Sequence, residues 1–213
     1  MEIKWLGHSS FLIKDSNGRT ILTDPFDDSI GYSTFSGDVD IVTISHHHFD
    51  HDYTKEISSK DGKVIDKVGN FYICDIAIQG IPSYHDEVKG AKRGENTIYL
   101  FQVDGYKLCH LGDLGYVPSI EELKDIGNVD ILLIPVGGHY TIDGKEALQI
   151  TKLIKNHIII PMHYKTPSLT FPLDGLENFL KHMKNAHKIN SNSITISGDL
   201  NDLENHVVIL DYE

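Results

Sequence analysis

The stretch SHHHFDHD at residues 45–52 places four histidines and two aspartates directly after the apolar run DIVTI at residues 40–44. In an extended segment, side chains two positions apart point the same way. His46 and His48 can therefore bind one metal ion, while His47 between them points away. Asp50 and His51 project differently and can reach a second ion beside the first. The spacing predicts parts of two adjacent metal sites at a strand end, where α/β proteins bind their ligands.

One loop cannot complete two coordination spheres, so the remaining ligands are expected at other strand ends. His85 follows the run AIQGIPSY, Asp113 follows YKLCHLG, and His163 follows IIIPM. A carboxylate has two oxygens and can bind two cations at once, which suits Asp113 to bridge the pair. The predicted ligands are His46, His48 and His85 for one metal, and Asp50, His51 and His163 for the other, with Asp113 between them. A chance run of polar residues in one loop would not explain the strand-end position of the other three.

Five further polar residues lie near these positions, and each has two interpretations. His110 either binds a metal directly or, as we favour, lies behind the ligands and supports them. Asp24 either hydrogen-bonds a ligand histidine or starts a turn before Pro25. His139 and Tyr140, in GGHYT, either face the substrate or lie exposed in a glycine-rich turn. Arg93, in KRGEN, can bind an anionic substrate group with two hydrogen bonds or be a solvated loop charge.

Apolar runs and turn signals indicate many strands with helices between them. Strands are predicted at residues 3–14, 19–25, 40–44, 63–68, 70–81, 97–111, 129–136, 157–162, 193–196 and 206–210, with a hairpin turn at Asp104-Gly105 inside the run 97–111. Helices are predicted at residues 119–127, 143–156 and 173–186. Strands with helices in both halves favour an α/β (α+β) fold, in which two sheets pack face to face with helices outside. No linker or repeat interrupts residues 1–213, which we interpret as a single domain.

The chain has 213 residues and a formal net charge of −12. Such an acidic surface repels phosphate backbones, so we expect neither DNA nor RNA as a partner. The N-terminal stretch lacks the basic and apolar regions of a signal peptide, and no apolar run is long enough to span a membrane. Cys74 and Cys109 are expected to be buried thiols in the reducing cytoplasm. The expected partner is a small-molecule substrate, anionic ones included, and a homo-oligomer is compatible with the sequence.

The ligand motif and several later segments resemble the metallo-β-lactamase superfamily. SHHHFDH matches its signature, and His85, Asp113 and His163 match its later ligand motifs in order. The segments HLGDLG, PVGGHYTIDGKEA, PMHYKT and YHDEVKGAKRGENTIYLF are similar to small single-domain hydrolases related to ascorbate-phosphate lactonase. The resemblance covers nearly the whole chain and implies a four-layer αββα sandwich of two mixed sheets, with the metal site at one edge. It does not imply β-lactam cleavage, because the superfamily hosts many chemistries.

The predicted activity is metal-dependent hydrolysis of a small ester, lactone or phosphoester. Imidazole and carboxylate ligands suit two zinc ions best, with manganese, iron or nickel as alternatives. Two adjacent metals can lower the pKa of a shared water towards about 7. The resulting metal-bound hydroxide is the expected nucleophile, and Asp50 would orient it and pass on a proton. Two other functions stay open: a metal-binding or sensing protein without turnover, and a phosphodiesterase or nuclease, which would need a basic groove beside the metals.

Overall fold

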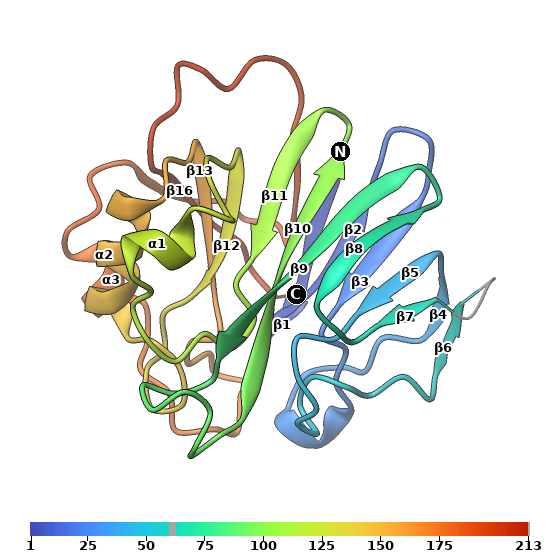
Figure 1. Cartoon of the computed structure of the whole chain (residues 1–213), viewed down its shortest axis with the longest axis horizontal. Helices are drawn as coiled ribbons and strands as arrows, with labels where there is room; N and C mark the ends of the chain where they lie inside the picture. Colours follow the sequence, from blue (N-terminus) through green and yellow to red (C-terminus); the bar gives the residue numbers. More distant parts are fainter. Residues whose placement is uncertain (60–62, 213) are drawn as a thin grey trace.

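The computed structural model describes residues 1–59 and 63–212, and its strands form two large mixed sheets whose inner faces share an apolar core (Figure 1). The six-stranded sheet has the order β15 (Ser193–Thr195), β1 (Glu2–Gly7), β2 (Ser10–Lys14), β3 (Thr20–Thr23), β5 (Ile41–Thr43), β7 (Val64–Ile65). Its side chains alternate between the two faces, as the two-residue period of a strand requires. Phe11 and Ile13 lie in the shared core, whereas Leu12 between them packs on the outer face near Leu22.

The eight-stranded sheet has the order β14 (Ala186–Lys188), β16 (His206–Ile209), β13 (Ile158–Met162), β12 (Ile131–Pro135), β11 (Tyr106–His110), β10 (Glu95–Val103), β9 (Ile76–Tyr84), β8 (Gly69–Ile73). Strands β11, β12, β13 and β16 are parallel, and every residue of β12 and β13 is buried. Both faces of these strands are therefore covered. The β10–β11 hairpin turns at the predicted Asp104-Gly105 pair, whose φ angles of 51° and 82° have the sign that a type I′ turn requires.

Helices cover the outer face of the eight-stranded sheet, on the left of Figure 1. Helix α2 (Gly144–Leu153) packs on β12 and on α3 (Glu177–Leu180). Its first turn is capped by Asp143, whose carboxylate accepts hydrogen bonds from the backbone of Lys145 and Glu146. Helix α1 (Ile120–Leu123) begins with the reciprocal hydrogen bonds between Ser119 and Glu122 that the sequence predicts.

The outer face of the six-stranded sheet is covered differently. In the described ranges its apolar residues pack against Phe35, Val39 of β4 (Gly37–Val39) and Ile57 of β6 (Ile57–Ser59), and no α-helix belongs to that cluster. The short helix η1 (Asp28–Ile30) belongs to a separate apolar cluster with Tyr32 and Leu169. Irregular chain and a two-stranded sheet thus form the fourth layer.

Two predicted strands are interrupted by turns. The run 3–14 breaks at Gly7 and His8, with φ angles of 108° and 51°, into β1 and β2. The run 70–81 breaks at Cys74, whose φ is 50°, into β8 and β9. Cys74 is therefore partly exposed in a turn, and the prediction of a buried thiol is wrong for it, whereas Cys109 is buried as expected.

The helix predicted at residues 173–186 is reduced to the single turn of α3. Ala186–Lys188 instead forms β14, which pairs with β16 along the edge of the sheet. Only Ala186 of the predicted helix lies in that strand, and the weak helical preference of the polar residues before it supports no more than the single turn of α3.

The strand directions bring many strand ends to one edge of the sandwich. β1, β3 and β5 run the same way, because β2 is antiparallel to β1 and β3, and β3 is parallel to β5. In the other sheet, β9, β11, β12 and β13 also run the same way. Contacts between the segments that follow β5, β9, β11 and β13 show that the two sets of ends meet.

Among the described residues, no helix is long and apolar enough to cross a membrane.

Candidate metal centre

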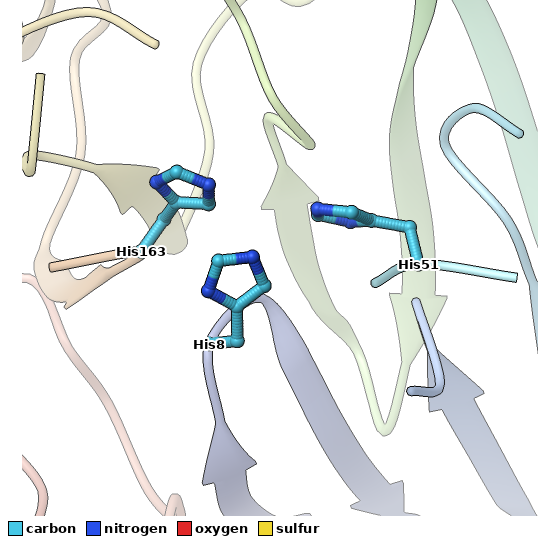
Figure 2. A group of neighbouring side chains, drawn as sticks. All are labelled: His8, His51 and His163. Atoms are coloured by element: carbon cyan, nitrogen blue, oxygen red, sulfur yellow. The ribbon is translucent and has the colours of Figure 1, made fainter. Parts of the chain in front are cut away.

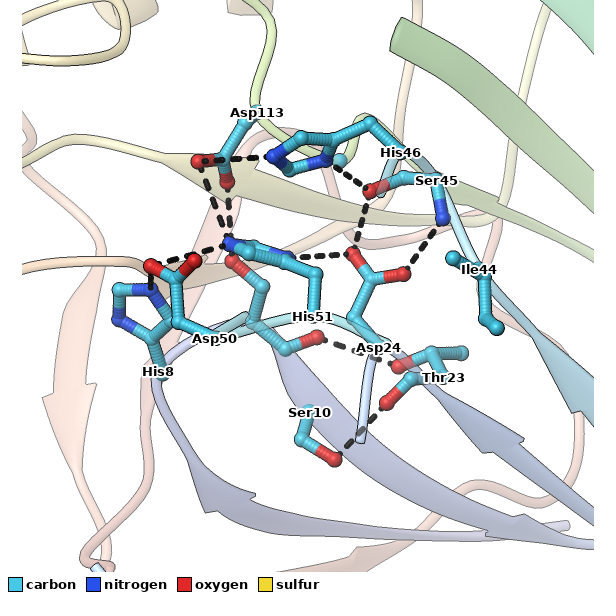
Figure 3. Close-up of polar contacts among 12 residues, drawn as sticks. His8, Ser10, Thr23, Asp24, Ile44, Ser45, His46, Asp50, His51 and Asp113 are labelled. Atoms are coloured by element: carbon cyan, nitrogen blue, oxygen red, sulfur yellow. Dashed lines mark hydrogen bonds and ion pairs between the residues drawn. The ribbon is translucent and has the colours of Figure 1, made fainter. Parts of the chain in front are cut away.

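Asp113 lies close to histidines of both predicted ligand groups, and Figure 3 shows its carboxylate beside His46 and His51. It follows β11 and is buried. Its Oδ2 atom is 3.3 Å from Nε2 of His51, 3.3 Å from Nε2 of His85, 3.2 Å from Nε2 of His163 and 4.0 Å from Nε2 of His46. These histidines follow strands of both sheets, so the carboxylate joins the two halves of the site. A bridging carboxylate would need this position.

His46, His48 and His85, assigned to the first metal, form a compact group. One potential ligand atom of each lies within 4.8 Å of the others. His46 Nε2 is 3.0 Å from His48 Nδ1. His47 lies outside the group, with Nδ1 3.3 Å from Asp52 Oδ2. The structure therefore brings the three predicted side chains together and leaves out the residue between them.

The side chains assigned to the second metal lie beside a histidine that sequence analysis missed. His51 and His163 form a group with His8, and their ligand atoms lie within 4.8 Å of one another (Figure 2). Asp50 Oδ2 is 3.7 Å from His51 Nε2 and 3.2 Å from His8 Nε2. Asp50 thus lies between a predicted ligand and a histidine that was given no role.

His8 is held in place through its backbone. Its side chain is fully buried, and its carbonyl oxygen accepts hydrogen bonds from Trp5 Nε1 at 3.0 Å and from the backbone N–H of His163 at 3.1 Å. The preceding Gly7 has a φ of 108°, and a Cβ there would lie 2.7 Å from the Tyr32 ring. The available signal was that His8 follows a strand end, as the predicted ligands do, but one uninterrupted strand was expected through it.

Asp24 anchors the segment that carries His46 and His51 through hydrogen bonds to Ser45 and His51 (Figure 3). It follows β3 and is buried, and its Oδ2 accepts a hydrogen bond from His51 Nδ1 at 3.0 Å. Its two oxygens also accept from the Ser45 backbone N–H at 2.7 Å and the Ser45 hydroxyl at 2.6 Å. Ser45 Oγ is in turn 2.9 Å from His46 Nδ1. With Nδ1–H bonded to Asp24, Nε2 is the nitrogen of His51 that is left to bind a metal ion, and it faces Asp113.

Burial keeps several of these imidazoles neutral. It lowers the pKa of His8 to about 4 and that of His46 to about 2, and it also lowers the pKa of His85. A neutral imidazole has a lone pair for a metal, whereas a protonated one has none. These side chains are therefore in the form that binds metals at neutral pH.

The carboxylates stay ionised at the same pH. Burial alone would raise the pKa of Asp113, but His163 and His51 beside it hold that pKa well below its usual range. Burial also opposes the ionisation of Asp50, and the neighbouring His51 and a hydrogen bond from His8 lower its pKa. Burial disfavours the charged form of His51, yet Asp113 and Asp50 raise its pKa well above the usual value. The site therefore favours positive charge at its centre, which a divalent cation would supply.

The donor set fits such a cation. His51 Nε2 is buried and makes no hydrogen bond within the described structure, although it faces Asp113. Buried polar atoms are nearly always satisfied, so an unsatisfied nitrogen at this position points to a missing partner. Imidazole nitrogens combined with carboxylate oxygens are ligands of Zn²⁺ and its first-row neighbours.

His110 is occupied elsewhere. It is fully buried, its Nε2–H donates to the Ser9 carbonyl oxygen at 2.8 Å, and its Nδ1 accepts from the backbone N–H of Gly112 at 3.1 Å. Neither nitrogen has a lone pair left for a metal. The hydroxyl of Ser9 hydrogen-bonds Asp113 Oδ1 at 3.3 Å, so His110 acts on the site through its neighbours.

A pocket of about 430 Å³ opens over the ligands. Its walls are Phe49, Phe171, Lys92, Arg93 and Tyr140, and it exposes Asp50, His48, His85, Asp113 and His163. Of the predicted substrate contacts, Arg93 and Tyr140 line the pocket. The side chain of His139 instead approaches Asp174, with Nε2 3.5 Å from Oδ1, and only its carbonyl oxygen takes part, by accepting a hydrogen bond from Arg93.

The chain is similar to known proteins along most of its length. A family model described as the beta-lactamase superfamily domain matches residues 2–163. A UPF0173 protein of Pyrococcus abyssi is 34% identical over 184 residues, which span 78% of this chain and 84% of the relative. A UPF0173 metal-dependent hydrolase of Carboxydothermus hydrogenoformans is 30% identical over 200 residues, spanning 78% and 85%. The crystal structure of a candidate zinc-dependent hydrolase of the metallo-β-lactamase superfamily from Thermotoga maritima matches with a TM-score of 0.81 and 35% identity, over 98% of this chain and 97% of that one. The likeness confirms the predicted fold class.

Proposed function

This chain belongs to the metallo-β-lactamase superfamily and is a metal-dependent hydrolase, and we propose that it cleaves a small ester, lactone or phosphoester. The observation that carries the proposal is the position of the pocket directly over Asp113 and its surrounding histidines. A molecule in this pocket would lie against the donor set. The size of the pocket suits a small molecule.

We propose two divalent metal ions per chain, because two groups of potential ligands meet at Asp113. Zinc is the first choice, and manganese, iron and nickel are alternatives with the same ligand types. Bound metals would lower the pKa of a water molecule and polarise the bond under attack.

Asp50 is the residue that we assign to proton transfer. It lines the pocket, and its carboxylate is ionised at neutral pH because His51 and His8 lower its pKa against the effect of burial. An ionised carboxylate in this position can orient the attacking water and accept its proton. The pocket-lining side chains of the described residues include no serine, threonine or cysteine, which supports water as the nucleophile.

The expected partner is a small molecule rather than a nucleic acid. The net charge of −12 disfavours binding of a phosphate backbone. A pocket beside the donor set also supports catalysis over metal sensing, because a protein that only binds the ion needs no space next to it.

The number of metals is measurable directly. Protein reconstituted with excess zinc or manganese is expected to hold close to two metal equivalents by elemental analysis. His48→Ala and His163→Ala should each retain about one, since they remove ligands of different metals. A firm ceiling of one equivalent in the wild type would rule out the two-metal proposal while leaving the superfamily assignment intact.

The substrate class is tested by a screen of the metal-loaded protein against lactones, esters, thioesters and phosphodiesters. At least one class should be hydrolysed, and both a chelator and Asp113→Ala should abolish the activity. If no class is hydrolysed, the protein binds metal without turnover. If it cleaves DNA or RNA oligonucleotides in preference to the small compounds, the nuclease alternative replaces the proposal.

A further inference from the structure

Two cationic side chains line the metal pocket of this otherwise acidic protein, and only one of them is available to a ligand. Lys92 Nζ pairs with Glu87 Oε1 on the same loop. Arg93 has no carboxylate within ion-pairing distance in residues 1–59 and 63–212. An uncompensated guanidinium next to a site rich in acidic and neutral groups calls for an anionic partner.

The guanidinium of Arg93 is already held in place. Its Nη2 donates to the carbonyl oxygen of His139 at 3.1 Å, and its central carbon lies 5.4 Å from the centre of the Tyr140 ring. Arginine has five N–H donors in a rigid fork, and His139 engages one nitrogen. The remaining donors are therefore free for a ligand, and little side-chain entropy is lost when one binds.

The loop that carries Arg93 is rigidly connected to the metal ligand His85. The buried carboxylate of Asp86 accepts four backbone hydrogen bonds along this loop, from Val88 (2.9 Å), Gly90 (2.9 Å), Lys92 (2.8 Å) and Arg93 (2.7 Å). The loop closes where the His85 N–H donates to the Gly94 carbonyl oxygen at 3.1 Å. Arg93 is thus fixed with respect to the catalytic end of the pocket.

We propose that Arg93, supported by Tyr140 and the His139 carbonyl, is an anion subsite, so that the substrate carries a carboxylate or phosphate group besides the bond that is cleaved. The inference rests on the proposed function and narrows it to anionic small esters, lactones or phosphoesters. Phe49 and Phe171, whose ring centres are 5.9 Å apart, supply apolar wall for the uncharged part of such a molecule.

Binding tests the subsite without any turnover. Benzenesulfonate and methyl phenyl sulfone have nearly the same shape, and only the first is charged, while sulfonates coordinate metals weakly. Calorimetric titration of the metal-loaded protein should show the sulfonate binding at least about tenfold more tightly, as expected of a charge-assisted hydrogen bond. Arg93→Met should remove this preference. Lys89→Met, which removes a charge from the same loop outside the pocket, should keep it.

Competition then identifies the anionic group. Succinate or glycerol 1-phosphate should displace benzenesulfonate from the wild type. The competitor that binds more tightly indicates whether the subsite prefers a carboxylate or a phosphate group. The inference is wrong if the wild type binds the sulfone as well as the sulfonate, or if neither competitor displaces it at millimolar concentration. It is also wrong if Lys92→Met abolishes the preference and Arg93→Met does not.

Hydrolysis provides the second readout. The wild type should have a lower KM for 4-nitrophenyl hydrogen succinate than for 4-nitrophenyl acetate, and Arg93→Met should raise the KM for the succinate ester roughly tenfold or more with kcat little changed. Arg93→Lys should have a KM between those of the wild type and Arg93→Met, because lysine keeps the positive charge but lacks the planar fork of N–H donors. If neither ester is cleaved, the ester form of the proposed function fails, while the binding experiment still decides the subsite.

Discussion

At the scale of single residues, we propose two tasks for Asp50, metal binding and proton transfer, and substitution can separate them. Asp50→Asn keeps the shape of the side chain and one oxygen, but it removes the negative charge that the proposal assigns to orienting water and accepting its proton. We expect kcat to fall by about 10²–10⁴-fold, the usual cost of losing a positioned proton-transfer group. Metal content by elemental analysis should fall much less.

The matched control for this substitution is His182→Ala, on the exposed segment after α3, which should change neither quantity. If Asp50→Asn retains near-normal kcat with both metals bound, Asp50 serves only as a ligand, and the proton leaves by another route.

His8 is expected to support Asp50. Its neutral ring donates from Nε2 to Asp50 Oδ2, because an imidazole lone pair facing a carboxylate would be repelled. His8→Ala should therefore weaken metal binding or activity by roughly 10–100-fold, as outer hydrogen-bond partners of metal ligands usually do. His8→Gln, which retains an N–H donor, should recover part of the loss. Metal affinity is measured by competition with a chelating dye, and unchanged affinity and kcat in His8→Ala would reduce His8 to a packing role.

The contrast between His8 and His85 shows which residues the sequence can reveal. His85 could be predicted because an apolar run visibly ends just before it. His8 follows a strand end too, but the next strand begins at Ser10, and only the positive φ values of Gly7 and His8 separate the two. The nitrogens of His110 could not be assigned from sequence either, since their partners Ser9 and Gly112 are set by tertiary packing.

At the scale of elements, close backbone contact between β9 and the segment after β11 aligns the predicted ligands His85 and Asp113. Gly115 N–H donates to the Tyr84 carbonyl oxygen at 3.0 Å, and a Cβ at Gly115 would lie 2.3 Å from the carbonyl carbon of His85. Gly115→Ala should push the two segments apart, destabilising the fold by about 1–3 kcal/mol. Metal affinity should fall as well, because His85 and Asp113 no longer converge.

A suitable control is Gly105→Ala at the tip of the β10–β11 hairpin. There φ is +82° and nothing lies within 4 Å of the added Cβ, so the strain is local. Its expected cost is about 1–2 kcal/mol with normal metal affinity. Equal metal affinity in the two variants, measured by dye competition, would show that the contact at Gly115 does not align the site.

Elements were predictable where the pattern was local and strong. The buried runs of β12 and β13 and the amphipathic helix α2 needed no tertiary information. The segment 173–186 has a helical apolar pattern, but only Glu177–Leu180 is helical and its last residue, Ala186, pairs with β16, and the sequence does not show where the helix stops. The cover of the six-stranded sheet was unpredictable for a similar reason, since Phe35 reaches it from irregular chain and Ile57 from the short strand β6.

At the scale of the whole molecule, the site joins two sheets through buried histidines and ionised aspartates, and the pKa values that burial lowers among these histidines make stability depend on pH. The pKa of His8 is lowered from 6.5 to about 4 by burial, and burial also lowers the pKa values of His46, His85 and His110. Between about pH 6.5 and 4 the unfolded chain therefore binds more protons than the folded one. The raised pKa of His51 has the opposite effect on the pH dependence of stability, but it is one group against the four whose pKa values are lowered.

The metal-free protein should accordingly lose stability as the pH falls from about 6.5 towards 4, by about 1.4 kcal/mol per pH unit for each net proton. Bound metal should raise Tm at pH 7.5, because an ion that binds the folded state at 100 times its Kd adds about 2.7 kcal/mol. This gain should shrink towards pH 5, where protons compete for the same nitrogens. Thermal unfolding followed by circular dichroism from pH 7.5 to 5, with and without EDTA, measures both effects. A metal-free Tm that rises on acidification, or a metal-dependent gain that is the same at pH 5 and 7.5, would contradict the lowered pKa values of His8, His46, His85 and His110.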